Sequence, residues 1–133
     1  MTDLVELSTD RADDGELLTL RHPSTDEPLE HDGEKMWIRV LGEDSDVLRN
    51  KATTIRRKKA RQFVRNQQAD ITTTPEEDLD FLVSATVDWR LFFDGEWIDC
   101  TREKKEEIFS KYHWIARQVN QFSGDISNFL ASR

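Results

Sequence analysis

Cys100 is the residue whose type and position come closest to those of a reactive group. It stands just before a predicted helix over Arg102 to Lys111, and the dipole at a helix N-terminus lowers the pKa of a thiol. With His113 as a base, such a thiol could act as a nucleophile. The alternative is a half-buried cysteine beside Trp97 and Ile98. We favour this alternative because free cysteines are usually buried and unreactive.

The remaining candidates for chemistry fail on spacing. The three histidines and the single cysteine do not have the spacing of zinc ligands. The five glycines are too far apart to form a phosphate-binding loop. An Asp-x-Asp pattern at Asp44 begins like a calcium loop, but Leu48 occupies a ligand position. The sequence therefore predicts no catalysis, no cofactor and no metal site.

Charge is strongly separated along the chain. Residues 47–66 contain eight Lys and Arg and no acid, whereas residues 1–46 carry 14 acids against 4 bases and residues 67–133 carry 13 against 7. An amphipathic helix is predicted here, beginning at Asp44, Ser45 or Asp46 and running to about Gln67. Its apolar stripe contains Leu48, Ala52, Ile55 and Phe63. Four bases that lie mostly off this stripe are candidate partner-binding residues: Arg56, Arg57, Lys58 and Arg61.

Three explanations of the basic helix remain open. It is a solvated face that offsets the acidic remainder, or it docks on an acidic or mixed protein surface, or it binds nucleic acid. Phosphate binding needs only a basic stripe. The net charge of −8 and the pI near 4.9 disfavour nucleic acid, because a negative body repels it.

Length and composition predict a single domain over residues 1–133 with a modest core. The apolar content is 36% and the charged content is 35%, while twelve aromatic residues argue against disorder. No apolar run approaches the roughly 18 residues of a membrane span. No signal peptide is recognisable, and the lone cysteine is consistent with a reducing cytoplasm.

The order of local patterns predicts an α+β fold. Residues 1–15 are expected to be a mobile acidic tail, with a short strand at Leu4 to Leu7. Residues 16–43 form the predicted β-hairpin region, with strands at Leu17 to Leu20 and Met36 to Leu41. Residues 44–133 form the predicted helical region, so a small hairpin or sheet should be followed by a bundle of three to five helices.

The second helix has the clearest start signal, with Thr74 as N-cap and Pro75 at the first helical position. Apolar residues at helical spacing predict that this helix continues to Trp89. The Asp94-Gly95 pair that follows predicts a turn, either in a tiny hairpin or between two helices. The predicted core contains Leu82, Val83, Trp89, Ile115, Val119 and Phe122.

Aromatic residues gather on either side of the predicted turn. The simplest interpretation of these rings is core packing, since each buries a large area. Rings left exposed would instead mark a surface for a protein partner. Three of them are therefore further candidate partner-binding residues: Phe92, Phe93 and Trp97.

Three segments resemble the tail assembly chaperones of long-tailed bacteriophages and prophages. They are Trp37 to Arg49 with the basic helix that follows, Leu82 to Arg102, and Trp114 to Leu130. The most specific motifs are Asp88-Trp89-Arg90 and Asp94-Gly95-Glu96-Trp97. Together with the stretch Leu18 to Pro23, the resemblance covers most of residues 17–130.

The resemblance implies a non-enzymatic factor for virion assembly. Such chaperones are thought to coat the tape measure protein, keep it soluble and help tail tube subunits polymerise around it. The expected partners are the tape measure protein and the tail tube protein, with weak self-association, in the host bacterial cytoplasm. Two alternatives stay open: a nucleic-acid-associated regulator that uses residues 47–66, and a structural tail or capsid component.

Overall fold

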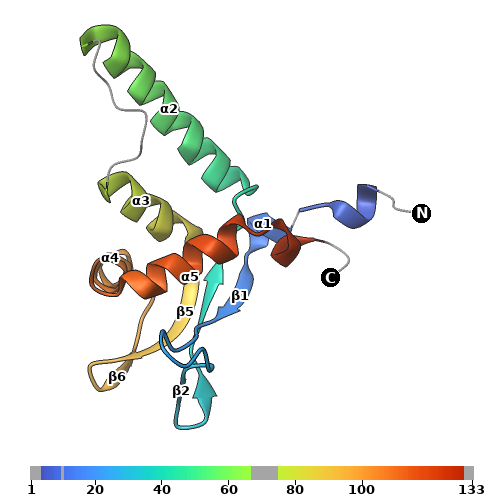
Figure 1. Cartoon of the computed structure of the whole chain (residues 1–133), viewed down its shortest axis with the longest axis vertical. Helices are drawn as coiled ribbons and strands as arrows, with labels where there is room; N and C mark the ends of the chain where they lie inside the picture. Colours follow the sequence, from blue (N-terminus) through green and yellow to red (C-terminus); the bar gives the residue numbers. More distant parts are fainter. Residues whose placement is uncertain (1–3, 10, 67–74, 131–133) are drawn as a thin grey trace.

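The computed structural model describes residues 4–9, 11–66 and 75–130. The fold is α+β, as the sequence predicts (Figure 1). The α-helices are α1 (Arg11–Asp14), α2 (Asp46–Asn66), α3 (Pro75–Ala85), α4 (Arg102–Lys111) and α5 (His113–Gly124). The strands are β1 (Glu16–Thr19), β2 (Glu30–His31), β3 (Glu34–Lys35), β4 (Trp37–Val40), β5 (Thr86–Phe93) and β6 (Glu96–Ile98). Two short 3-10 helices are η1 (Leu4–Leu7) and η2 (Ile126–Phe129).

Four strands form an antiparallel sheet in the order β1-β4-β5-β6. The expected N-terminal hairpin is present, because β1 pairs with β4. The long connection between these two strands contains the small β2–β3 hairpin. β5 and β6, which come from the region expected to be helical, complete the sheet.

Alternation along the strands separates two faces of this sheet. Ile38 pairs with Trp89 and Leu91 pairs with Ile98, and all four side chains are buried in the core. On the other face Trp37 pairs with Arg90 and Phe92 pairs with Trp97, and these side chains are only partly buried. α5 contacts β4 and α3 contacts β5, so helices cover the core face.

The predicted core is largely confirmed. Leu82, Val83, Trp89, Ile115 and Val119 are buried, with Val119 fully inaccessible. Phe122 is half-buried and packs against the core from its edge. Ile108 and Phe109 of α4 complete the core.

The prediction that the second helix reaches Trp89 was wrong. α3 begins at Pro75 as expected but ends at Ala85, where Thr86 Oγ1 donates to the Leu82 carbonyl at 2.9 Å. The proposed cap Thr74 lies outside the described residues. From Thr86 onward the chain is a strand, because pairing with β4 and β6 gives its β-prone residues partners on both sides. Burial of both Trp89 and Leu91 has the period of two of a strand, whereas only Trp89 also fits the helical spacing from Leu82.

The turn at Asp94-Gly95 is the tiny hairpin, not a helix connection. Asp94 has φ 51° and Gly95 has φ 87°, the left-handed geometry that a two-residue hairpin requires. Phe93 pairs with Glu96 directly across it. The described residues from Asp46 to Leu130 therefore form helices with an embedded hairpin, so the predicted helical region also supplies two strands of the sheet.

The N-terminal segment is not the mobile tail with a short strand that the sequence predicts. Leu4–Leu7 is a 3-10 helix and not a strand. Arg11–Asp14 is a turn of α-helix whose Ala12 is 1% exposed. The Gly42 amide donates to the Ala12 carbonyl at 3.0 Å, and the Arg11 guanidinium forms an ion pair with Glu16. These contacts dock α1 on the end of β4.

α2 begins at Asp46, within the predicted range, and ends at Asn66. Ser45 is the N-cap, since its hydroxyl accepts the Leu48 amide at 3.2 Å. Figure 1 shows α2 extending from the rest of the molecule with α3 beside its first half. Within the described ranges, no helix combines the length and the apolar character needed to cross a bilayer.

Candidate protein-interaction site

Four exposed bases lie on the second half of α2. Leu48 is buried, and Ala52 and Ile55 are half-buried, so the first three turns of the helix pack on the body. The predicted bases are all exposed, and none has an ion pair or hydrogen bond within the described chain: Arg56, Arg57, Lys58 and Arg61. The side chain of Phe63, predicted to extend the apolar stripe, lies outside what is described.

An ion-pair network connects the first half of α2 to α3 and α4. Lys51 Nζ lies 2.5 Å from Asp80 Oδ2 of α3, and Arg102 of α4 lies 3.5 Å from the other oxygen of the same carboxylate. Arg102 also pairs with Glu106 at 3.0 Å. Asp80 therefore links α2, α3 and α4, and it fixes the direction in which the basic part of α2 points.

A groove runs beside α2 where the helix leaves the body. It has a volume of about 560 Å³ and lies between α2, α3 and α4. Ile55, Leu79 and Val83 supply apolar lining, and Lys58 stands among the charged residues around them. A second groove of about 390 Å³, with Ala52 and Phe81 in its lining, lies between α2, α3 and α5. Both grooves combine apolar surface with charge, which suits an amphipathic helix.

Phe92 and Trp97 form an aromatic cluster on the outer face of the β5–β6 hairpin. Their ring centroids are 5.3 Å apart in an edge-to-face arrangement. His31 from β2 stacks on Phe92 with a centroid separation of 3.6 Å. The Arg90 guanidinium lies 4.1 Å above the Trp97 ring and pairs with Glu34 at 2.6 Å. The cluster thus fastens the β2–β3 hairpin to the sheet.

Phe93 does not belong to this cluster, because the next residue along a strand points to the opposite face. Its ring is edge-to-face with Tyr112 at 6.2 Å, and the Lys111 ammonium lies 5.5 Å from the ring centroid. Phe93 and Tyr112 border an apolar hollow of about 310 Å³ with Leu29 and Met36. This hollow lies between the long β1–β4 connection and the last two α-helices.

The predicted partner-binding residues do not converge on one site. The bases are on α2, whereas Phe92 and Trp97 are at the β5–β6 turn beside β2. Figure 1 places α2 and the β6 and β2 hairpins at opposite ends of the long axis. The molecule therefore has two separate candidate surfaces, one basic and one aromatic.

The geometry favours the unreactive interpretation of Cys100. Burial raises the pKa of its thiol, and Asp88 raises it further, while Lys105 acts in the opposite direction. A raised pKa keeps the thiol protonated and weakens it as a nucleophile. His113 Nε2 lies 3.1 Å from the Ser110 carbonyl, and the ring makes no hydrogen bond to Cys100 within the described chain. Within the same ranges, no group of three or more metal-ligating side chains comes together.

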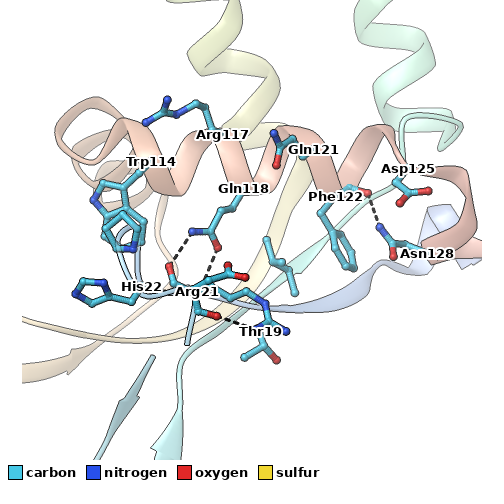
Figure 2. A pocket seen from close by; sticks show the side chains of 13 residues that line it. Thr19, Arg21, His22, Trp114, Arg117, Gln118, Gln121, Phe122, Asp125 and Asn128 are labelled. Carbon is cyan, nitrogen blue, oxygen red and sulfur yellow. Dashed lines mark hydrogen bonds between the residues drawn. The ribbon is translucent and has the colours of Figure 1, made fainter. Parts of the chain in front are cut away.

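A further groove, absent from the sequence predictions, lies between β1 and α5 (Figure 2). Its volume is about 580 Å³, and its lining includes Thr19, Arg21, Gln118 and Phe122. The Gln118 side chain crosses the groove and bonds to the backbone of Arg21. No local pattern identifies this contact, because 97 residues separate its two partners. The sequence does not identify His31 as a site residue for the same reason. Arg90 could have been identified, because alternation along a strand places Arg90 and Phe92 on the same face.

Comparison with protein-family models, with curated proteins and with solved structures gives no match.

Proposed function

We propose that this chain is a non-enzymatic tail assembly chaperone of a long-tailed bacteriophage or prophage. It binds the tape measure protein in the cytoplasm of the host bacterium and assists assembly of the tail tube around it. The observation that carries the proposal is the projecting part of α2, whose four exposed bases have no partner in the described chain. The resemblance of Asp88-Trp89-Arg90 and Asp94-Gly95-Glu96-Trp97 to the chaperone family supports it.

The client is an amphipathic helix that lies in a groove beside α2. The apolar lining at Ile55, Leu79 and Val83 accepts its apolar stripe, and this contact supplies most of the affinity. Lys58 at the same groove faces acidic residues of the client, while Arg56 stands at the second groove beside α2. These charges steer the approach and set the register.

Weak self-association accompanies client binding. A tape measure protein presents many similar helical segments, so several copies of the chaperone bind along one client. Contacts between neighbouring copies, although weak alone, then add to the total affinity through a high effective concentration. The aromatic cluster at Phe92 and Trp97 faces away from α2 and is the surface offered to a neighbouring copy or to a tube subunit.

Co-expression with the tape measure protein of the same genome tests the proposal. The client should remain in the soluble fraction when this chain is present and should precipitate when it is absent. A Cys100→Ser variant should support client solubility as well as the wild type does, because no covalent step is involved. A chaperone unrelated in sequence, expressed at the same level, controls for a general effect of overexpression.

Two results would contradict the proposal. One is a client that is equally soluble with and without this chain. The other is a chain that shifts duplex DNA at near-physiological salt and leaves the client insoluble, which would favour the nucleic-acid-associated regulator. Stable incorporation into purified virions would instead favour a structural tail or capsid component.

A further inference from the structure

β1 leaves one row of backbone groups unpaired at the edge of the sheet. The Leu20 amide donates to the Met36 carbonyl at 3.0 Å, so the backbone of Leu20 faces toward the β4 side. In an antiparallel pair, successive residues face opposite sides of the strand. The amides and carbonyls of Leu17 and Thr19 therefore face away from β4. β1 is an edge strand, so no neighbouring strand of the described chain receives them.

The next residue along this edge is already bound in the manner of an added strand. Gln118 Oε1 accepts the Arg21 amide at 3.0 Å, and Gln118 Nε2 donates to the Arg21 carbonyl at 2.8 Å (Figure 2). This pair of bonds is the one that a residue of a neighbouring antiparallel strand makes. The side-chain amide of α5 thus closes the edge at Arg21 and leaves Leu17 and Thr19 open.

The space beside the open edge has the dimensions and lining of a peptide groove. It is about 580 Å³ in volume, with β1 along one side and α5 along the other. Leu18, Trp114 and Phe122 give it apolar lining. The charged side chains along it are balanced, with Arg21 and Arg117 against Asp26 and Asp125, and amides stand between them at Gln118, Gln121 and Asn128.

We propose that the β1–α5 groove binds an extended, uncharged polar segment of a partner protein, which adds to the sheet as a fifth strand beside β1. Its backbone pairs with Leu17 and Thr19, and main-chain bonds of this kind supply affinity in strand addition. Its side chains contact Trp114, Gln121 and Phe122. The groove has no net charge, in contrast to the basic part of α2, so a neutral segment matches it best.

A second copy of this chain fits the groove less well than a free segment. Two β1 strands related by a two-fold axis perpendicular to the sheet keep their helices on the same face. Each copy's own α5 lines its β1 edge, so both helices would occupy the same space. The inference is independent of the proposed function, since it depends on β1 and α5 and not on α2.

The test uses ¹⁵N-labelled protein and a capped neutral peptide, Thr-Val-Thr-Gln-Val. In the free protein, the amides of Leu17 and Thr19 should exchange with solvent quickly. At about 1 mM peptide, their exchange should slow by about tenfold, while exchange of Leu18 and Leu20, already facing β4, stays unchanged. The same peptide with alternate amides N-methylated lacks the donors for pairing and should have no effect.

A matched pair of variants locates the binding at the edge. Thr19→Pro removes the edge amide and blocks an added strand, yet it leaves the bonds to β4 in place because that amide faces outward. It should weaken peptide binding by about tenfold, which is the loss of roughly one to two hydrogen bonds. Thr19→Val keeps the amide and should bind within about twofold of the wild type. Circular dichroism confirms that both variants are folded.

Three results would overturn the inference. The first is unchanged exchange at Leu17 and Thr19 in the presence of the peptide, or equal slowing by the N-methylated peptide. The second is protection of these amides in the protein alone that grows with protein concentration, because a second copy then occupies the edge. The third is tighter binding of the same peptide with Glu or Lys at its centre, which would contradict the neutral chemistry.

Discussion

Trp89 shows how a single residue can be assigned correctly to the core for an incomplete reason. Its helical spacing from Leu82 predicts burial, and its side chain is 5% exposed. The ring is nevertheless presented by a strand, opposite Ile38 of β4. Its indole Nε1 donates to the Ile98 carbonyl at 3.1 Å, which ties β5 to the end of β6 through a buried bond. Burial follows from size and hydrophobicity, whereas the element depends on partners distant in sequence.

The first prediction at the residue scale concerns this side chain. Trp89→Ala should lower the free energy of unfolding by about 3–5 kcal/mol, because it leaves a large cavity between the sheet and the helices. Trp89→Phe should cost less, about 1–3 kcal/mol, since the ring is kept but the Ile98 carbonyl loses its donor. Urea denaturation measures both. A cost for Trp89→Ala below about 1 kcal/mol would mean that the ring is not part of the core.

At the scale of elements, the parts that local chemistry controls were predictable. Ser45 caps α2 and Thr101 caps α4, where its hydroxyl accepts the Lys104 amide at 3.2 Å. Pro75 begins α3, and the Asp94-Gly95 turn has the positive φ values that its residue types allow. Each signal involves residues at most four positions apart, so the sequence carries it directly.

The elements that depend on distant contacts were not predictable in this way. β5 requires β4, which lies about fifty residues earlier, and α1 requires the end of β4. The residues of the candidate site also divide into those that local sequence identifies and those that depend on distant contacts. The exposed bases of α2 follow from composition and periodicity, whereas the stacking of His31 on Phe92 and the Gln118 bridge to Arg21 are set by tertiary packing.

The second prediction tests the docking of α1. A Cβ added at Gly42 would lie 2.6 Å from Ala12 Cβ and 3.1 Å from Phe129 Cδ2. Gly42→Ala should therefore push α1 from the body and cost about 1–3 kcal/mol of stability. Ala12→Gly in the same chain removes the closest contact, so the double variant should recover part of that loss.

Thermal denaturation of the two single variants and the double variant gives the coupling between these positions. A coupling of at least about 0.5 kcal/mol is expected for residues in direct contact. Additive effects would show that α1 does not pack on Gly42 in solution. The N-terminal segment would then behave as the mobile tail that its acidic composition suggests.

At the scale of the whole molecule, the main feature is the separation of a basic helix from an acidic body. The chain has a net charge of −8, yet the exposed residues from Arg56 to Arg61 are dominated by bases. If these bases only offset the charge of the body, contacts with its acids would be expected. The four bases instead have no ion pair or hydrogen bond in the described chain, and the helix that carries them extends from the rest of the molecule (Figure 1). This arrangement favours a docking surface over a solvated face.

The last prediction separates steering by these bases from a general effect of charge. Arg56→Glu with Arg57→Glu should slow association with an immobilised helical fragment of the tape measure protein by about tenfold at low salt, with a smaller effect at high salt. Lys35→Glu with Lys111→Glu makes the same change in net charge at exposed sites away from α2 and should slow association much less. Both pairs should melt close to the wild type, since exposed charges contribute little to stability. Biolayer interferometry at several salt concentrations measures the rates. Equal slowing by the two pairs would mean that net charge alone controls the encounter, and α2 would no longer be the docking surface.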